Sequence, residues 1–187
     1  VNLSVVQLLQ NDIVKKIKSA IEDSHINPAN LTLEVTESLA INDMVRMKKI
    51  LSEIKGLGVK VALDDFGTGY SSLNHIREMP IDIIKIDRCF VSGIQHSAYN
   101  YRLLHNMVEL ARSSQIRVCC EGVETRDELA ALEELGSVLI QGYLFNPPLT
   151  ADVFTRTYIQ QDTVEYEGHA ALKRELYRLK WSEEQLP

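Results

Sequence analysis

Residues 59–70 read Val59-Lys-Val-Ala-Leu-Asp64-Asp65-Phe-Gly67-Thr-Gly69-Tyr70. The first five residues predict a buried β-strand, because the run is mostly apolar and Gly56 and Gly58 end the segment before it. Two adjacent carboxylates follow, and then Gly67 and Gly69, which allow the sharp turns with positive φ that a tight loop needs. We therefore expect a strand that ends at residue 63 and an acidic loop from 64 to 70.

This unit of helix and apolar strand recurs along the chain. Helical spacing of apolar residues, breakers and capping signals place helices at about 4–21, 44–54, 99–113, 125–136 and 150–158, with Thr150 as the N-cap of the last; a short helix begins at Ser71 and ends before Pro80. Apolar runs place strands at 31–35, 59–63, 81–86, 116–120 and 138–140.

Alternating strands and helices predict an α/β fold with a parallel sheet covered by helices. An open doubly wound sheet and a barrel both fit this order. No G-x-G-x-x-G or G-x-x-x-x-G-K-[ST] loop follows any of the predicted strands. A (β/α)₈ barrel typically needs ~250 residues, so the chain is shorter than a full barrel by roughly two strand-helix units.

Composition narrows the class of protein. The chain has 187 residues, 45% of them apolar, and a formal net charge of −6, so no overall basic character indicates binding to a DNA or RNA polymer. Its three cysteines, Cys89, Cys119 and Cys120, form no C-x-x-C pair, and the adjacent two should point to opposite faces of a strand. We expect a cytoplasmic setting with reduced thiols, although the parent protein could be tethered to a membrane.

Polar residues stand in or just after each predicted strand. They are Glu34, the pair Asp64 and Asp65, Lys85, Glu121 and Gln141. In α/β folds the carboxyl ends of parallel strands form the ligand-binding rim, so these groups should meet there. An acid that follows a strand can instead cap the next helix, and ion pairs can be purely structural. Capping does not explain Glu34 or Lys85, because each lies inside its strand.

The chemistry of this predicted rim favours hard cations. Carboxylate and amide oxygens suit Mg²⁺ or Mn²⁺, and no H-x-x-H pattern indicates zinc. Adjacent Asp64 and Asp65 could serve two ions ~3.5–4 Å apart, a spacing suited to phosphoester hydrolysis.

Six motifs stand in order from residue 1 to about 149: Val-Asn2-Leu-Ser, Leu-Glu34-Val-Thr-Glu37-Ser, Ala-Leu-Asp64-Asp65-Phe-Gly-Thr-Gly-Tyr-Ser-Ser-Leu, Ile-Lys85-Ile-Asp87, Glu121-Gly-Val-Glu124-Thr and Gln141-Gly-Tyr-Leu-Phe. This set gives the chain a close resemblance to the EAL family of cyclic di-GMP phosphodiesterases. It implies a (β/α)₈ TIM-like barrel, lacking its first strands in this chain, that hydrolyses cyclic di-GMP to linear pGpG with two Mg²⁺ or Mn²⁺ ions.

The resemblance also implies a role for each matching residue. By analogy, the first metal is bound by Asn2, Glu34 and Asp64, and the second is bound by Asp64, Asp65 and Glu121. Asp64 would bridge the two ions.

Further roles follow from the same resemblance. Lys85 would orient the attacking water with Gln141 beside it, so that Lys85, Glu121 and Gln141 form the catalytic set. Glu37 would anchor the Asp-Asp loop, with its glycines Gly67 and Gly69, and Glu124 would support the site. The loop region would also contribute to a homodimer interface.

The Glu-Ala-Leu motif that names the family has no counterpart in this chain. Glu128-Leu-Ala comes near in letters but lies in a late predicted helix. We expect the motif and further signalling domains elsewhere in the parent protein. The alternative is a catalytically inactive EAL module that acts as a cyclic di-GMP receptor or a protein-interaction domain. We assign 1–160 to a partial EAL barrel and 161–187 to a C-terminal extension, expected to be helical from Leu172, Leu176 and Leu179 on one face.

Overall fold

A parallel sheet forms the centre of the molecule. The computed structural model describes residues 1–36, 44–67 and 79–159. The sheet order follows the chain, with every neighbouring pair parallel: β1 (Thr32–Thr36), β2 (Lys60–Phe66), β3 (Ile83–Ile86), β4 (Arg117–Glu121) and β5 (Leu139–Gln141). A doubly wound sheet reverses its strand order at a switch point, whereas a barrel does not. The barrel prediction is therefore confirmed over these strands.

The N-terminal residues extend this sheet beside β1. A parallel bridge pairs Asn2 with Glu34, and two backbone hydrogen bonds of 2.8 Å join Leu3 N to Glu34 O and Glu34 N to Val1 O. Strand β1 is therefore hydrogen-bonded on both sides, to the N-terminal residues on one side and to β2 on the other.

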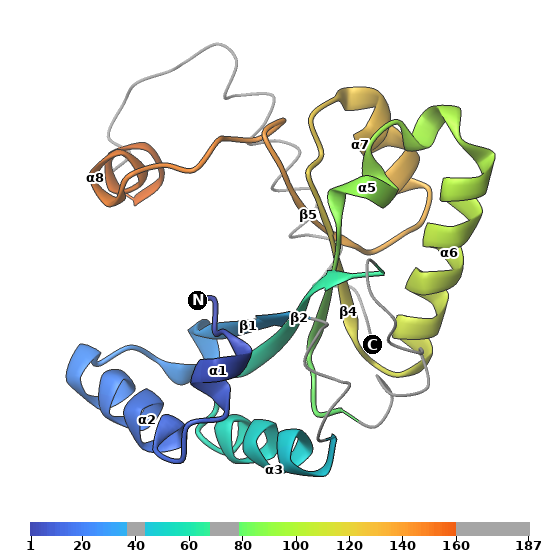
Figure 1. The fold of residues 1–187 in the computed structure, drawn as a ribbon. Helices are drawn as coiled ribbons and strands as arrows, with labels where there is room; N and C mark the ends of the chain where they lie inside the picture. Colours follow the sequence, from blue (N-terminus) through green and yellow to red (C-terminus); the bar gives the residue numbers. More distant parts are fainter. Residues whose placement is uncertain (37–43, 68–78, 160–187) are drawn as a thin grey trace.

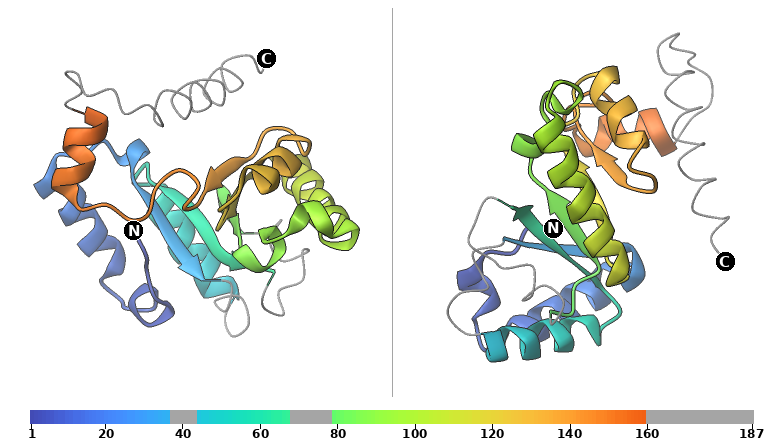
Figure 2. Two further views of the ribbon diagram at one scale, coloured as in Figure 1. Left: turned by 90° about the horizontal axis from the view of Figure 1, so that it is seen from above. Right: turned by 90° about the vertical axis from the view of Figure 1, so that its right-hand side faces the viewer.

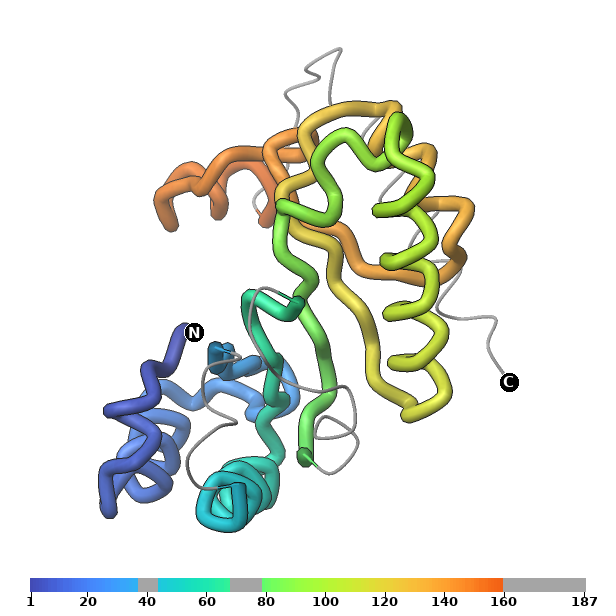
Figure 3. The backbone as a smooth tube through the Cα atoms, turned by 45° about the vertical axis from the view of Figure 1, so that its right-hand side comes forward, coloured from blue at the N-terminus to red at the C-terminus, as the bar shows by residue number. Residues whose placement is uncertain are grey.

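The longer helices cover the outer side of the curved sheet. Figures 1 and 2 show α2 (Ile13–Ser24) and α3 (Met44–Lys55) beside the β1–β2 part, and α6 (Ala98–Ser113) and α7 (Arg126–Glu133) beside the β4–β5 part. Figure 3 shows the same arrangement as a continuous tube. The shorter elements are α1 (Val5–Leu8), η1 (Pro28–Asn30), α5 (Arg88–Val91), η3 (Ile94–His96), α8 (Ala151–Phe154) and the π-helical turn η4 (Thr155–Ile159). None of the helices in the described ranges has both the length and the apolar character that a bilayer crossing requires.

The two faces of the sheet have separate cores. The outer face and the helices share one large core that includes Val35, Val61, Ile86 and Cys120. A smaller inner cluster contains Ala62, Ile83 and Cys119, with Leu139 packed against it. Alternate side chains of a strand point to opposite faces, which confirms that Cys119 and Cys120 diverge.

Two predictions about element boundaries were wrong. The helix expected over 4–21 is divided into α1 and α2, because Ser4 and Gln7 form a capping box and the turn-forming residues 10–12 interrupt the pattern. Strand β2 runs on through the two aspartates, so the loop does not begin at Asp64. The helical prediction for 150–158 is confirmed, because α8 and the π-helical turn η4 together run from Ala151 to Ile159 with Thr150 as the N-cap, although Thr150 makes no side-chain capping bond.

The other predicted helices and strands of the described ranges agree with the structure, whereas η1, α5 and η3 match no predicted element. Helix α3 ends before Gly58, whose φ is +88°, and the capping box of Thr125 and Glu128 opens α7. Two predicted features, the short helix from Ser71 and the extension over 161–187, lie outside the described residues.

Candidate functional site

Four charged side chains share the inner face near the carboxyl ends of the strands. The strand register pairs Glu34 with Ala62, Lys85 with Cys119, and Glu121 with Gln141. Residues two apart on a strand share a face, so the alternation puts Glu34, Asp64, Lys85 and Glu121 on the same face as the small inner cluster. That cluster forms the apolar floor beneath them.

Lys85 lies at the centre of this group. Its Nζ is 2.7 Å from Glu121 Oε1, 3.0 Å from Glu34 Oε2 and 3.0 Å from Asp64 Oδ1. Lys85 is only 6% exposed. We call these four residues the Lys85 cluster; its members come from β1, β2, β3 and β4, so the sheet itself sets their spacing.

The electrostatics of the cluster follow from one cation shared by three anions. Burial alone would lower the pKa of Lys85, but the nearby carboxylates of Glu121, Glu34 and Asp64 outweigh burial and raise the pKa. Burial raises the pKa of Glu121, and Lys85 only partly offsets this because two other carboxylates lie nearby. The raised pKa of Lys85 keeps its ammonium charged, whereas the raised pKa of Glu121 shows that its carboxylate is the anion that burial disfavours. A further cation beside the carboxylates would oppose that effect.

One carboxylate oxygen of Asp64 can accept a further interaction. Its Oδ1 is buried and accepts no hydrogen bond from residues 1–36, 44–67 and 79–159, although the Lys85 ammonium lies 3.0 Å away. The distance supports an ion pair, and a carboxylate has further lone pairs that this contact does not use. Carboxylate oxygens of this kind are preferred ligands of Mg²⁺ and Mn²⁺, so the donor chemistry fits the predicted metals.

The arrangement of the carboxylates around Lys85 limits how a metal ion could bind. Within the described residues, no three side chains of His, Cys, Asp or Glu are arranged as a ready metal site. In the Lys85 cluster, the ammonium takes the central position that three carboxylates could otherwise share. A metal ion would therefore have to bind beside Lys85 and draw carboxylate oxygens away from it.

A bulge gives Asp65 a different position from the one that strand alternation implies. In a regular strand Asp65 would point into the outer core, but the pairing of β2 with β3 shifts register between Leu63 and Phe66. Asp65 has a φ of +56° and is exposed, while Phe66 is buried. Such a bulge redirects a side chain, and here it brings both aspartates to the carboxyl end of β2.

Two more predicted site residues, the metal ligand Asn2 and the catalytic residue Gln141, lie beside the cluster without belonging to it. Asn2 is the bridge partner of Glu34, and Gln141 is the register partner of Glu121. Both residues are exposed at the edges of the described sheet. The structure therefore brings them to the same rim, next to the carboxylates that they were expected to assist.

The predicted supporting residues have mixed outcomes. Glu124 forms an ion pair with Arg88 at 3.0 Å and does not join the Lys85 cluster. Gly67 has a φ of +97°, and a Cβ there would lie 2.7 Å from the ring of Phe90, so this position requires glycine. Glu37 and Gly69 lie outside the described residues.

Sequence reasoning missed two groups of contacts. Asp82 accepts a hydrogen bond of 2.8 Å from Val61 N and pairs with Lys55 at 2.7 Å, which ties β2 to the start of β3. Its only signal was an acid inside the apolar run 81–86. Nothing in the sequence around Arg88 indicated a role, because its contacts are with residues that follow the neighbouring strand β4.

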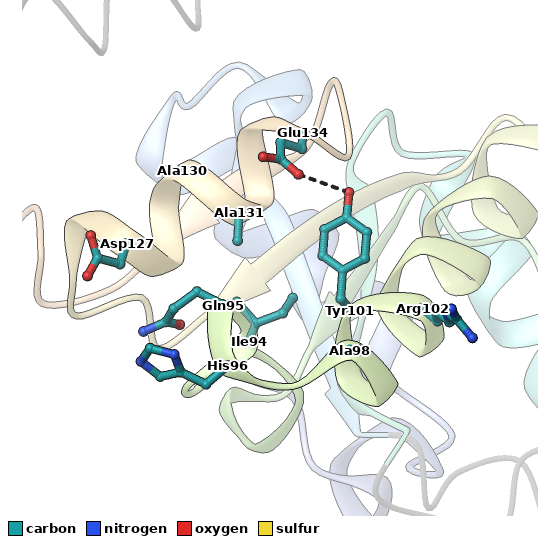
Figure 4. A pocket seen from close by; sticks show the side chains of 10 residues that line it. All are labelled: Ile94, Gln95, His96, Ala98, Tyr101, Arg102, Asp127, Ala130, Ala131 and Glu134. Carbon is teal, nitrogen blue, oxygen red and sulfur yellow. Dashed lines mark hydrogen bonds between the residues drawn. The ribbon is translucent and has the colours of Figure 1, made fainter.

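A separate pocket of about 690 Å³ lies in the outer helical layer (Figure 4). It is lined by η3, α6 and α7, where Tyr101 donates a hydrogen bond of 3.4 Å to Glu134. No residue of the Lys85 cluster lines it. The inner face of the sheet, and not this pocket, is therefore the candidate active site.

Comparisons with known proteins agree with this assignment. The profile of the EAL domain matches residues 1–148. The chain is 36% identical over 152 residues to the bifunctional diguanylate cyclase/cyclic di-GMP phosphodiesterase MucR of Pseudomonas aeruginosa, covering 81% of this chain and 22% of MucR. Across the curated relatives that it matches, the chain spans about a fifth of their length.

Solved structures show the same fold. The EAL domain of Mycobacterium smegmatis DcpA superimposes with a TM-score of 0.81 at 29% identity, over 87% of this chain and 73% of that one. A manganese and cyclic di-GMP complex of Klebsiella pneumoniae BlrP1 gives a TM-score of 0.74 at 32% identity, over 79% and 38% of the two chains. With the sheet order, the rim carboxylates and the family match in agreement, the chain belongs to the EAL domain family.

Proposed function

We propose that the protein is a cyclic di-GMP phosphodiesterase that hydrolyses its substrate to linear pGpG with the help of two Mg²⁺ or Mn²⁺ ions. The observation that carries the proposal is the Lys85 cluster, which gathers three carboxylates and a buried lysine at the carboxyl rim of the sheet. MucR and BlrP1, to which the chain is similar, are named for this nucleotide or bind it.

The residues divide into metal-holding and water-orienting groups. Asn2, Glu34 and Asp64 would hold one ion, and Asp64, Asp65 and Glu121 would hold the other. When bound, such ions make a water more acidic and stabilise the charge that develops on the phosphoester.

Lys85 has a different task in this proposal. Its ammonium donates hydrogen bonds from a fixed place on β3, so it can orient a water near the carboxylates, with Gln141 next to it in the register of β5 and β4. Its contacts with three carboxylates also restrain the ligands before metal binds.

Several finer features belong to the same proposal. We propose a homodimer that uses the Asp-Asp loop region, a cytoplasmic location for the domain, and additional signalling domains in the protein. The large size of the curated relatives supports the last point. The dimer would be tested by sedimentation of the full-length protein with and without nucleotide.

The hydrolysis test uses full-length protein with cyclic di-GMP and either Mg²⁺ or Mn²⁺. We expect chromatography to show pGpG, and we expect Glu34→Ala to abolish it while the matched control Glu53→Ala, an exposed acid on α3, retains parental activity. The proposal is wrong if pGpG is absent under both metals, or if Glu34→Ala remains as active as the control.

One observation favours a second function, a receptor that binds cyclic di-GMP without cleaving it. Lys85 already neutralises part of the charge on the three carboxylates, as it would in a module that works without metal. Calorimetry in EDTA distinguishes the phosphodiesterase from the receptor. Tight nucleotide binding in EDTA, with no turnover after metal is added, would support the receptor.

A further inference from the structure

The loops that follow β3 and β4 are tied to each other directly above the candidate site. Arg88 comes after β3, three residues beyond Lys85, and Glu124 comes after β4, three residues beyond Glu121. Arg88 Nη2 lies 3.0 Å from Glu124 Oε1. This ion pair therefore connects the two strands that supply the closest contact in the Lys85 cluster.

The stem of Arg88 makes a second contact with the same loop. Gly122 follows Glu121 immediately and has a φ of +71°. A Cβ at Gly122 would lie 2.6 Å from Arg88 Cβ and 2.9 Å from Cδ, so the aliphatic stem occupies the space over the glycine. The conformation and the close approach both require glycine here. The residue next to Glu121 is thus covered by Arg88.

A buried carboxylate holds the base of these loops. Glu128 is 6% exposed and accepts hydrogen bonds of 3.0 Å from the backbone N–H groups of Gly93, Glu124 and Thr125. Gly93 belongs to the segment after β3, and the other two belong to the segment after β4. These hydrogen bonds therefore fix the backbone around Glu124, so the carboxylate that pairs with Arg88 starts from a fixed position.

Glu121 needs such restraint. It lies 2.7 Å from Lys85 Nζ, in a group where the other two carboxylates repel it. A flexible strand end would let its carboxylate move toward solvent and lose the lysine. The segment 122–124 is the part of the chain that can prevent this movement.

We propose that Arg88 is a positioning residue for Glu121: its stem holds Gly122 and its guanidinium holds Glu124, so that the Glu121 carboxylate stays beside Lys85. Arg88 acts through Glu121 and need not touch the substrate. The consequence for turnover rests on the proposed function, whereas the consequence for metal affinity does not.

The test compares three variants of the full-length protein. Arg88→Ala removes stem and charge, Arg88→Met keeps most of the stem, and Arg117→Ala is the matched control, because Arg117 is exposed at the opposite end of β4. Calorimetry with Mn²⁺ alone gives metal affinity, and steady-state kinetics with cyclic di-GMP give kcat and KM.

We expect Arg88→Ala to weaken Mn²⁺ binding and to lower kcat by about tenfold each, the lower end of the effect of losing an outer partner of a metal ligand. KM should stay within about twofold, Arg88→Met should lose about threefold or less, and Arg117→Ala should match the parent. If Arg88→Ala melts too low to be measured, Glu124→Gln removes the ion pair from the other side without straining the backbone, and a loss of Mn²⁺ affinity in the same direction is expected.

Two results would overturn the inference. One is an Arg88→Ala variant with parental Mn²⁺ affinity and kcat. The other is a raised KM with unchanged kcat in both Arg88 variants, which would show direct contact with the anionic substrate. If the parent shows no hydrolysis, the proposed function fails, and the Mn²⁺ measurement still decides the role of Arg88.

Discussion

Replacing Lys85 with Met should destabilise the protein in the absence of metal, although methionine is the more hydrophobic residue. The Lys85 side chain is 8% exposed, and the side chains of its partners Glu34, Asp64 and Glu121 are 16–25% exposed. Breaking a buried ion pair by removing one partner costs ~3–5 kcal/mol, because the other charge is left uncompensated. The carboxylates keep some contact with water, so we expect the lower end, about 3 kcal/mol of unfolding free energy.

Mn²⁺ should reverse most of this loss. The ammonium and a metal ion compete for the same oxygens, so removing Lys85 frees them for the metal. At a free Mn²⁺ concentration of about 100 times its Kd, binding stabilises the folded state by about 2.7 kcal/mol. The increment on adding Mn²⁺ should therefore be larger for Lys85→Met than for the parent.

Urea unfolding followed by circular dichroism, in EDTA and in Mn²⁺, measures both effects. The matched control is Lys48→Met, because Lys48 is an exposed lysine on α3 away from the sheet rim. The reasoning is refuted if Lys85→Met is as stable as the control in EDTA, since Lys85 would then not hold the three carboxylates together. An equal Mn²⁺ increment in all three proteins would also contradict it.

Three further predictions concern other parts of the fold. Hydrogen bonds from backbone N–H groups hold the pKa of Glu128 below its usual value despite burial, so Glu128→Gln should cost about 2–3 kcal/mol at neutral pH, and the difference from the parent in urea unfolding should shrink as the pH falls below 4.5. Gly142→Ala should give insoluble or strongly destabilised protein on expression, because a Cβ there would overlap the backbone of β4's following loop. Cys119 and Cys120 are buried, which raises their pKa to about 12, whereas Cys89 is exposed and its pKa is raised less, to about 11, by partial burial and by Asp87; mass spectrometry after iodoacetamide treatment of native protein at alkaline pH should therefore find label on Cys89 alone.

The sequence predicted the strands and the central residues of the site because their signals are local. Glu34 and Lys85 are charged residues inside apolar runs, and only a partnered or functional role explains such placement. The structure confirms that they meet, at 3.0 Å. The motif of Thr125 and Glu128 likewise fixes the start of α7 through contacts between near neighbours in the chain.

What the sequence could not show depends on contacts between distant segments. The bulge that redirects Asp65 arises from the pairing of β2 with β3, and alternation alone would have placed this side chain in the core. The covering of Gly122 by Arg88 depends on two loops that are far apart in the chain. The place of Lys85 at the centre of the carboxylates also required the register of the sheet, which periodicity does not give.

The central claim is that the Lys85 cluster is the active site of a cyclic di-GMP phosphodiesterase. The most direct measurement is the rate of pGpG formation by full-length protein in Mn²⁺, compared between the parent and Lys85→Met under conditions where both are folded. We predict a fall of about 10²-fold or more, with Mn²⁺ binding retained, because the substitution removes the group that we propose orients the water and leaves the proposed oxygen ligands in place. A Lys85→Met protein that bound Mn²⁺ and kept near-parental turnover would contradict the account in its central residue.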